Sequence, residues 1–275
     1  MVIKMPELPE VQTVVNGLKP IIIGKKITKI RPIWHKVLEN FSENTINNVA
    51  KAHRIYNVTR RAKFIILHLE GKILAIHLRM TGKLFLTKEN QIPVHCTAVM
   101  FLEGGESLIF QDTRKFGRMY LYADMSIIDS RHGLEPLEKD FTERWLIQGL
   151  KFRNRNIKSL LLDQSFISGL GNIYVDESLW YAGIHPLSKS NAIPLPNIKK
   201  LRLGIIIILQ KAIKFRGTTI IDFSFLNGES GRYSKELRVF GRNKKTCDEC
   251  SEIISKTRVA GRGTYVCTSC QKIFS

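Results

Sequence analysis

Apolar side chains recur at helical spacing near the beginning of the chain. Five of them fall on one face of a helix with about 3.6 residues per turn: Leu8, Val11, Val14, Val15 and Leu18. Pro9 fits this interpretation, because a proline in the first turn of a helix removes an N–H group that has no intrahelical partner. The pattern predicts an amphipathic helix over residues 7–18.

From about residue 27 to residue 122 the spacing changes to that of short strands. Residues 64–69, 73–78 and 107–110 are runs rich in β-branched and aromatic side chains, which favour extended backbone. Glycine-containing segments such as residues 103–105 separate these runs and are typical of turns. Several short strands in succession predict a β-sandwich in this half of the chain.

Helical periodicity returns after residues 133–136, so the β-rich and helical halves should meet between residues 124 and 140. A glycine-rich segment, residues 169–172, joins the first two elements of the second half. Three helices are predicted there, over residues 158–164, 174–182 and 197–215.

No part of the sequence indicates export or membrane insertion. The longest apolar run, residues 201–209, is too short to cross a bilayer, so a buried helix is the better interpretation. The first ten residues are broken by prolines and acids and contain no apolar export segment. Five cysteines without an export signal favour a reducing compartment, the cytoplasm, where paired cysteines more often bind metal than form disulfides.

The charge balance points to a polyanionic partner. Lys and Arg number 43 against 24 Asp and Glu, which gives a formal net charge of +19. Because the basic residues run along the whole chain, the charge belongs to a folded surface and not to a disordered arm. Nucleic acid is the commonest partner of such a surface, although a basic protein with a merely solvated surface is the alternative.

Four cysteines near the end of the chain form two C-x-x-C pairs, with residues 251–266 between them. Four thiolates at this spacing match a tetrahedral zinc site, and the intervening residues can form a two-stranded hairpin. A zinc ion with four protein ligands has no open coordination position, so we expect one structural zinc ion and no metal catalysis. The predicted ligands are Cys247, Cys250, Cys267 and Cys270. Cys96 lies far from them in strand-like sequence and is expected to be a small core residue.

Short blocks of chemistry-bearing residues are spread across the chain. They are residues 5–11 (MPELPEV), 60–63 (RRAK), 77–82 (HLRMTG), 112–117 (DTRKFG), 161–164 (LLDQ), 169–174 (GLGNIY), 217–219 (GTT), 236–242 (ELRVFGR) and 261–264 (GRGT). With the cysteine pairs, and in this order, the blocks resemble the bacterial formamidopyrimidine-DNA glycosylases. The resemblance covers nearly the whole chain.

The resemblance implies an α+β fold in three parts. An N-terminal catalytic β-sandwich with flanking helices covers residues 5–130, a helix–two-turn–helix DNA-binding domain covers residues 137–235, and a zinc-finger β-hairpin covers residues 236–275. It also implies a bifunctional DNA glycosylase and AP lyase that excises 8-oxoguanine and formamidopyrimidines and then cuts the abasic site by β,δ-elimination. The partner is double-stranded DNA with oxidised purines or abasic sites, bound by a monomer at the bacterial nucleoid.

Four residues match the family's catalytic groups. Pro6 is the nucleophile, Glu7 the proton carrier, Lys63 a general acid/base or phosphate contact, and Arg262 a phosphate ligand that assists the second elimination. Each has a simpler interpretation. Pro6 and Glu7 also suit the first turn of a helix, Lys63 could merely lead into a strand, and Arg262 could be a solvated side chain.

Six residues match the family's DNA contacts. Met80, Arg114 and Phe116 correspond to a wedge that fills the gap left by a flipped-out base, whereas the pattern alone would make Met80 and Phe116 core residues. Asn172, before a helix, suits a phosphate held by backbone N–H groups and an amide. The further DNA contacts implied are His95 and Arg153.

Other positions refine or weaken the resemblance. Leu8 favours the purine-directed branch over the related enzymes for oxidised pyrimidines, and residues 227–233 match the loop that closes over the flipped base. Lys115 stands where many members have arginine, which keeps the charge but loses bidentate geometry. Four residues precede the family's usual start, and a Pro6 inside a chain is an amide without nucleophilicity. A zinc-dependent binder of damaged DNA that lacks catalysis is therefore the alternative.

Overall fold

The computed structural model describes residues 5–88, 91–218 and 231–275. Its contacts group the chain into two compact units. The first contains Met1–Ser130 and Arg216–Gly231, and the second contains Arg131–Phe215 and Arg232–Ser275. The chain therefore leaves the first unit, builds most of the second, and returns to the first before it ends in the second.

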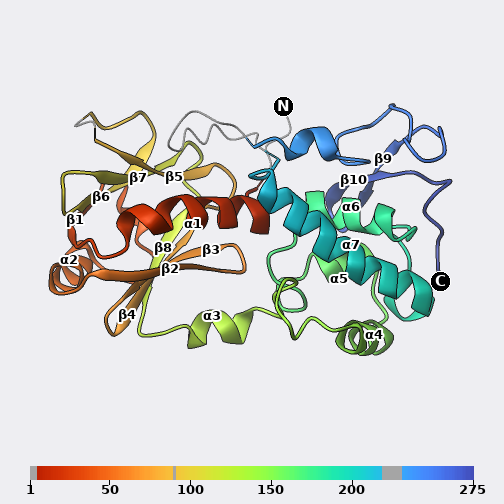
Figure 1. Cartoon of the computed structure of the whole chain (residues 1–275), viewed down its shortest axis with the longest axis horizontal. Coiled ribbons are helices and arrows are strands. Elements are labelled where there is room, and N and C mark those ends of the chain that lie inside the picture. The colour runs from red at the N-terminus through yellow and green to blue at the C-terminus, as the bar shows by residue number, and fades with distance from the viewer. Residues whose placement is uncertain (1–4, 89–90, 219–230) are drawn as a thin grey trace. The chain divides into compact units, whose positions relative to one another are not determined.

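The first unit is built on two antiparallel four-stranded sheets (Figure 1). One sheet has the order β1-β6-β7-β5 and the other has the order β2-β3-β4-β8. The strands are β1 (Ile27–Pro32), β2 (Ile55–Arg61), β3 (Phe64–Leu69), β4 (Lys72–His77), β5 (Gly82–Thr87), β6 (Cys96–Leu102), β7 (Ser107–Asp112) and β8 (Arg118–Tyr122). The helical elements are α1 (Leu8–Ile22), η1 (His35–Val37), α2 (Glu43–Ala52) and α3 (Ser126–Arg131).

One buried cluster joins the two sheets to α1. It includes Val14 from α1, Leu67 from β3 and Phe110 from β7, all at most 1 % exposed. Apolar side chains that alternate along the strands therefore meet across the space between the sheets, as in a sandwich. The predicted β-sandwich and N-terminal helix are confirmed, and the helix continues to Ile22, beyond the predicted residue 18. Cys96 is 6 % exposed, in agreement with its predicted core role.

The strand-like interpretation of residues 27–122 is wrong at α2. This helix is rich in asparagine, but the buried Ile46 and the partly buried Val49 pack into the core cluster. A polar contact adds to this packing. The Asn47 side chain accepts a hydrogen bond from the Ile30 N–H at 2.6 Å and donates one to the Ile30 carbonyl at 3.1 Å. Ile46 and Val49 are three residues apart, as on one face of a helix, and the strand interpretation missed this short signal.

The second unit is mostly helical and ends in a two-stranded hairpin (Figure 1). The long apolar run lies in the last long helix, where Leu201, Ile205 and Leu209 are buried, as predicted. Among the described residues no helix is long and apolar enough to cross a membrane. The elements are α4 (Glu143–Lys151), α5 (Ile157–Leu161), α6 (Asn172–Tyr181), η2 (Ser190–Ala192), α7 (Leu195–Lys214), η3 (Tyr233–Glu236), β9 (Ser255–Val259) and β10 (Arg262–Val266).

Buried charges connect the helices of the second unit to its hairpin. The Lys158 ammonium on α5 donates to Asp176 Oδ1 on α6 at 2.6 Å and to Thr264 Oγ1 on β10 at 2.8 Å. Asp176 Oδ2 also accepts the backbone N–H of Tyr265 at 3.0 Å. Both charged side chains are fully buried. Burial raises the pKa of Asp176 to about 7, although the Lys158 ammonium acts in the opposite direction.

A second buried carboxylate fixes the segment that leads into the cysteine region. Glu177 on α6 accepts the backbone N–H groups of Arg238, Val239 and Phe240 at distances of 2.8, 2.9 and 2.7 Å. These three amides satisfy a carboxylate that is 2 % exposed, which makes its burial tolerable. Asp176 and Glu177, which are adjacent on α6, thus hold the hairpin and the segment that leads to it.

Candidate active site and metal centre

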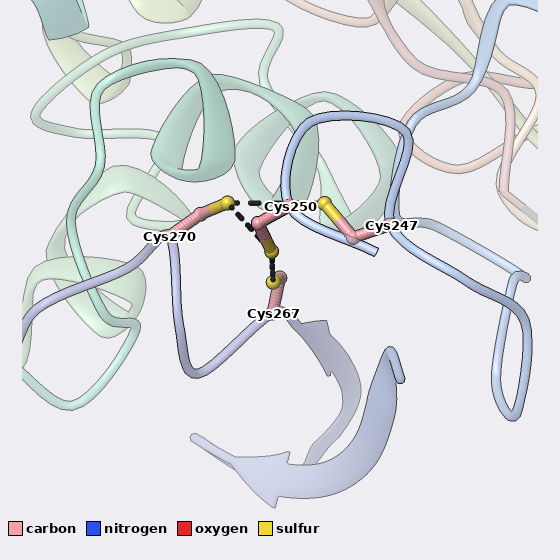
Figure 2. A group of neighbouring side chains, drawn as sticks. All are labelled: Cys247, Cys250, Cys267 and Cys270. Carbon is pink, nitrogen blue, oxygen red and sulfur yellow. Dashed lines mark hydrogen bonds between the residues drawn. The ribbon is translucent and has the colours of Figure 1, made fainter. Parts of the chain in front are cut away.

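The four cysteines of the C-terminal region converge on one point (Figure 2). Their sulfur atoms all lie within 4.8 Å of one another. The separations are 3.8 Å for Cys247 and Cys270, 3.4 Å for Cys250 and Cys267, and 3.3 Å for Cys250 and Cys270. A zinc ion bound tetrahedrally at about 2.3 Å from each thiolate separates the sulfurs by about 3.8 Å. The cluster therefore fits a zinc ion.

Each cysteine pair is closed by the same kind of backbone turn. The N–H of Ser251 donates to the carbonyl of Cys247 at 3.0 Å, and the N–H of Gln271 donates to the carbonyl of Cys267 at 3.0 Å. The first pair precedes β9 and the second follows β10, so the hairpin brings the pairs together. Zinc bound here stabilises the fold and leaves no position for a reacting group.

Asn172 on α6 is bonded to the strand that carries Arg262 in the second unit. Arg262 is the first residue of β10, beside the turn at Ala260 and Gly261, and its side chain is exposed. Asn172 is the first residue of α6, and its amide nitrogen donates to the Gly263 carbonyl at 2.8 Å. This bond joins the start of α6 to the strand that carries Arg262.

The N-terminal segment is buried and fixed by a residue that the sequence interpretation missed. Pro6 is buried and Glu7 is 3 % exposed. The Glu7 N–H donates to Glu10 Oε2 at 3.0 Å, while Glu10 Oε1 accepts the N–H and the hydroxyl of Thr218 at 2.9 and 3.1 Å. The backbone next to Thr218 can come this close to Glu10 only because residue 217 is glycine, since a Cβ there would lie 2.7 Å from Glu10 Oε1. The sequence did contain a signal for the role of Glu10, because it lies three residues after Glu7, which is the spacing of a capping box.

Lys63 lies in the turn between β2 and β3, and it is 9 % exposed. Its neighbour Ala62 has a positive φ of 53°. Arg60 holds this turn, because its guanidinium donates to the Ala62 carbonyl and to Gln12 Oε1 on α1, both at 3.0 Å. The turn is thereby tied to the helix that begins just after Pro6.

Of the three predicted wedge residues in the first unit, Arg114 contacts the other two. The Arg114 guanidinium carbon lies 4.6 Å from the centre of the Phe116 ring, and its Nη1 is 3.2 Å from Met80 Sδ. Phe116 is 45 % exposed, so the core interpretation of this residue is wrong. Two of the three line a cavity of about 420 Å³, whose lining residues are Met5, Glu39, Arg79, Met80, Phe116, Arg118 and Tyr120.

The remaining predicted DNA contacts are both exposed. His95 precedes β6 with a φ of 63°, and its carbonyl accepts the N–H of Asp112 at 2.9 Å. Arg153 follows α4, and its guanidinium carbon lies 4.8 Å from the Phe166 ring centre. The predicted closing loop lies largely outside the described residues, which resume at Gly231.

Family models match three consecutive parts of the chain. The model described as formamidopyrimidine-DNA glycosylase N-terminal domain matches residues 5–119, and that of the glycosylase H2TH domain matches residues 132–224. A zinc finger found in FPG and IleRS matches residues 244–273. With this match to the converging thiols, the prediction of one bound zinc ion is confirmed.

Curated relatives and solved structures agree with the family models. A formamidopyrimidine-DNA glycosylase of Protochlamydia amoebophila is 42 % identical over 92 % of this chain and 94 % of its own. One of Pelotomaculum thermopropionicum is 40 % identical over 98 % of this chain and 100 % of its own.

Two structures of the Lactococcus lactis FPG protein are similar over 97 % of this chain. A mutant form in complex with DNA containing Fapy-dG has a TM-score of 0.91 at 36 % identity and is covered over its full length. A complex with DNA containing an abasic site has a TM-score of 0.90 at 36 % identity and is covered over 99 %. The chain belongs to the formamidopyrimidine-DNA glycosylase family.

Proposed function

We propose that this protein excises oxidised purines from double-stranded DNA and then cuts the strand at the resulting abasic site. The observation that carries the proposal is the buried Pro6-Glu7 segment at the start of α1, fixed by Glu10 in the unit that also contains Lys63 and the wedge residues. The Lactococcus lactis relative is bound to Fapy-dG DNA and to abasic DNA in its structures, which supports the same substrates here.

The chemistry follows from a proline that carries a secondary amine. Its nitrogen attacks C1′ of a flipped-out nucleotide, the bond from C1′ to the base breaks, and the base leaves with a proton. Glu7 protonates the ring oxygen as the sugar opens, and a positively charged imine (an iminium ion) links Pro6 to C1′. The imine withdraws electrons, so loss of a C2′ proton expels the 3′ phosphate and a second elimination expels the 5′ phosphate. Water then hydrolyses the imine and frees Pro6.

The cationic residues hold the DNA backbone during these steps. Lys63 contacts a phosphate or transfers a proton beside α1, while Arg262 and Asn172 hold a flanking phosphate from the zinc hairpin. Arg262 also stabilises the phosphate that leaves in the second elimination. His95 and Arg153 add contacts to the backbone. The bound zinc ion supplies no reaction chemistry and keeps the hairpin that carries Arg262 folded.

The wedge residues lower the cost of extruding the damaged nucleotide. Met80 and Phe116 occupy the space that the base leaves, and the Arg114 guanidinium probes the opposite strand. Leu8 in the N-terminal segment favours purine over pyrimidine lesions. We place the protein on bacterial chromosomal DNA in the cytoplasm, since its relatives are bacterial and a similar protein is bound to DNA in its structures.

Borohydride trapping on a duplex containing 8-oxoguanine tests the proposal. Reduction of the imine should join the protein covalently to the damaged strand, and an undamaged duplex of the same sequence should give no adduct. A gel shift on abasic DNA without any trapped complex would identify a binding protein that lacks catalysis and would refute the proposed activity.

DNA affinity should fall steeply with salt. A surface that neutralises about five phosphates predicts a slope of about −4 to −5 for log K against log salt concentration. The net charge of +19 motivates this expectation. Fluorescence anisotropy with an abasic duplex between low and physiological salt measures the slope. A nearly flat titration would contradict binding through the phosphate backbone.

A further inference from the structure

Asp112 is a buried carboxylate to which the proposed chemistry gives no role. It is the last residue of β7 and is 0 % exposed. Its Oδ1 accepts the hydroxyl of Thr81 and the backbone N–H of Arg114, the latter at 3.2 Å, and its Oδ2 accepts the N–H of Gly117 at 2.7 Å. One carboxylate thus binds three donors, which come from two different loops.

The two loops begin at the same end of one sheet. Asp112 is paired with Gly82, the first residue of β5, so residues 78–81 and residues 113–117 lie side by side. Thr81 strengthens this junction, because its hydroxyl oxygen also accepts the Arg114 N–H at 3.1 Å. The Thr81 hydroxyl therefore links the loop that carries Met80 to the loop that carries Arg114 and Phe116.

The backbone at Gly117 passes so close to Phe110 and Asp112 that no side chain fits at this position. A Cβ at this position would lie 2.4 Å from the Phe110 ring and 3.1 Å from Asp112 Oδ2. The chain must pass this close for the Gly117 N–H to reach the carboxylate. The loop that ends at Gly117 is therefore held at both of its ends by Asp112, through Arg114 and through Gly117.

We propose that Asp112, acting through Thr81, is a positioning residue that assembles the wedge before DNA binds. This inference rests on the proposed function. Side chains that are already in contact lose less conformational freedom when they enter the duplex, so more of the binding energy is available to extrude the base. The lyase steps at an abasic site need no extrusion and do not draw on this arrangement.

A purely structural role for Asp112 makes a different prediction. If the carboxylate only stabilises the sheet, its loss should lower all activities together with the folded fraction. If it positions the wedge, its loss should lower base excision from duplex DNA selectively. The deficit should also shrink when the lesion faces an abasic site, because an unpaired base costs less to extrude.

The test uses variants of the full-length zinc-bound protein. Thr81→Val removes the hydroxyl that joins the loops, Thr81→Ser retains it, and Asp112→Asn removes the charge. Thr97→Val is the matched control. Thr97 is a buried threonine of the same sheet, and its hydroxyl donates to the Phe110 carbonyl at 2.9 Å, outside the junction.

Single-turnover rates are compared on three duplexes, which contain 8-oxoguanine opposite cytosine, 8-oxoguanine opposite an abasic site, and a preformed abasic site. For Thr81→Val and Asp112→Asn we expect about a tenfold loss on the first duplex, a smaller loss on the second, and rates within about twofold of wild type on the third. Thr81→Ser should restore the first rate, and Thr97→Val should leave all three rates unchanged.

Equal losses on the first and third duplexes, or no loss at all, would overturn the inference. If Asp112→Asn does not fold, the Thr81 pair decides the question, since it leaves the carboxylate intact. Met80→Ala is measured in parallel. A wild-type protein without excision refutes the proposed function itself. If Met80→Ala selectively loses excision on the first duplex while Thr81→Val excises at the wild-type rate, only the positioning role of Asp112 is refuted.

Discussion

A protein that retains residues 1–5 in front of Pro6 is expected to form no imine on damaged DNA. The nitrogen of an internal proline belongs to an amide, and its lone pair is delocalised into the carbonyl group. Only a chain that begins at Pro6 offers a nucleophilic secondary amine. We expect trapping and base excision to fall by on the order of a thousandfold or more.

Two preparations of the protein test whether the free amine of Pro6 is required. One begins at Pro6 after removal of Met5, the other keeps residues 1–5 behind a blocked amino group, and intact mass verifies each. Both are assayed by borohydride trapping on an 8-oxoguanine duplex. Normal trapping yield in the extended form would refute the Pro6 mechanism. Lys63→Met in the extended background would then show whether the Lys63 amine had replaced it.

Replacement of Cys267 by serine should release the zinc ion and reduce DNA nicking by on the order of a hundredfold or more. A structural zinc site contributes about 10–16 kcal/mol to folding of the segment that holds it. Arg262 lies on β10, five residues before Cys267, and Asn172 is bonded to the carbonyl of Gly263 on the same strand. Without the metal, Arg262 and Asn172, the two predicted phosphate contacts, are therefore no longer held in fixed positions.

Cys96→Ser is the matched control for this change. Cys96 is also a buried thiol, but it lies in β6, outside the cluster, and donates to the carbonyl of Ala98. It should keep one zinc ion per chain and normal nicking. Metal analysis by mass spectrometry and a nicking assay on the same preparations decide the outcome. Full activity in a Cys267→Ser protein without zinc would show that the metal is dispensable.

Hydrophobic periodicity predicted the parts of the fold that depend on apolar burial. The N-terminal helix, the strand at residues 64–69 and the long α7 helix all have apolar faces that enter the core. The α2 helix was missed because its apolar face is short, only Ile46 and Val49, and because the amide of Asn47 also fixes it to β1. A polar side chain that bonds to a distant backbone leaves no periodic signal.

The same limit applies to the candidate site. Motifs identified the residues proposed to contact DNA, since these carry recognisable chemistry at recognisable spacing. Glu10 and Asp112 lie inside two of these motifs, but the motifs gave no role to their carboxylates, which bind hydroxyl and backbone donors from separate loops. Such a role depends on which loops the fold brings together, and one sequence does not contain that information. Lys158 and Asp176 were missed for the same reason, since their partners lie on a distant strand.

The discontinuous first unit has a consequence for the order in which the protein folds during synthesis. Glu10 near the beginning of the chain finds its partner in Thr218, which the ribosome adds after most of the second unit. Until then a carboxylate that is 5 % exposed in the finished protein lacks two of its donors. A nascent chain released after Ser130 should therefore hold a sandwich with an incomplete N-terminal segment. The N-terminal end of α1, beside the proposed nucleophile, becomes complete only after Thr218 has been added.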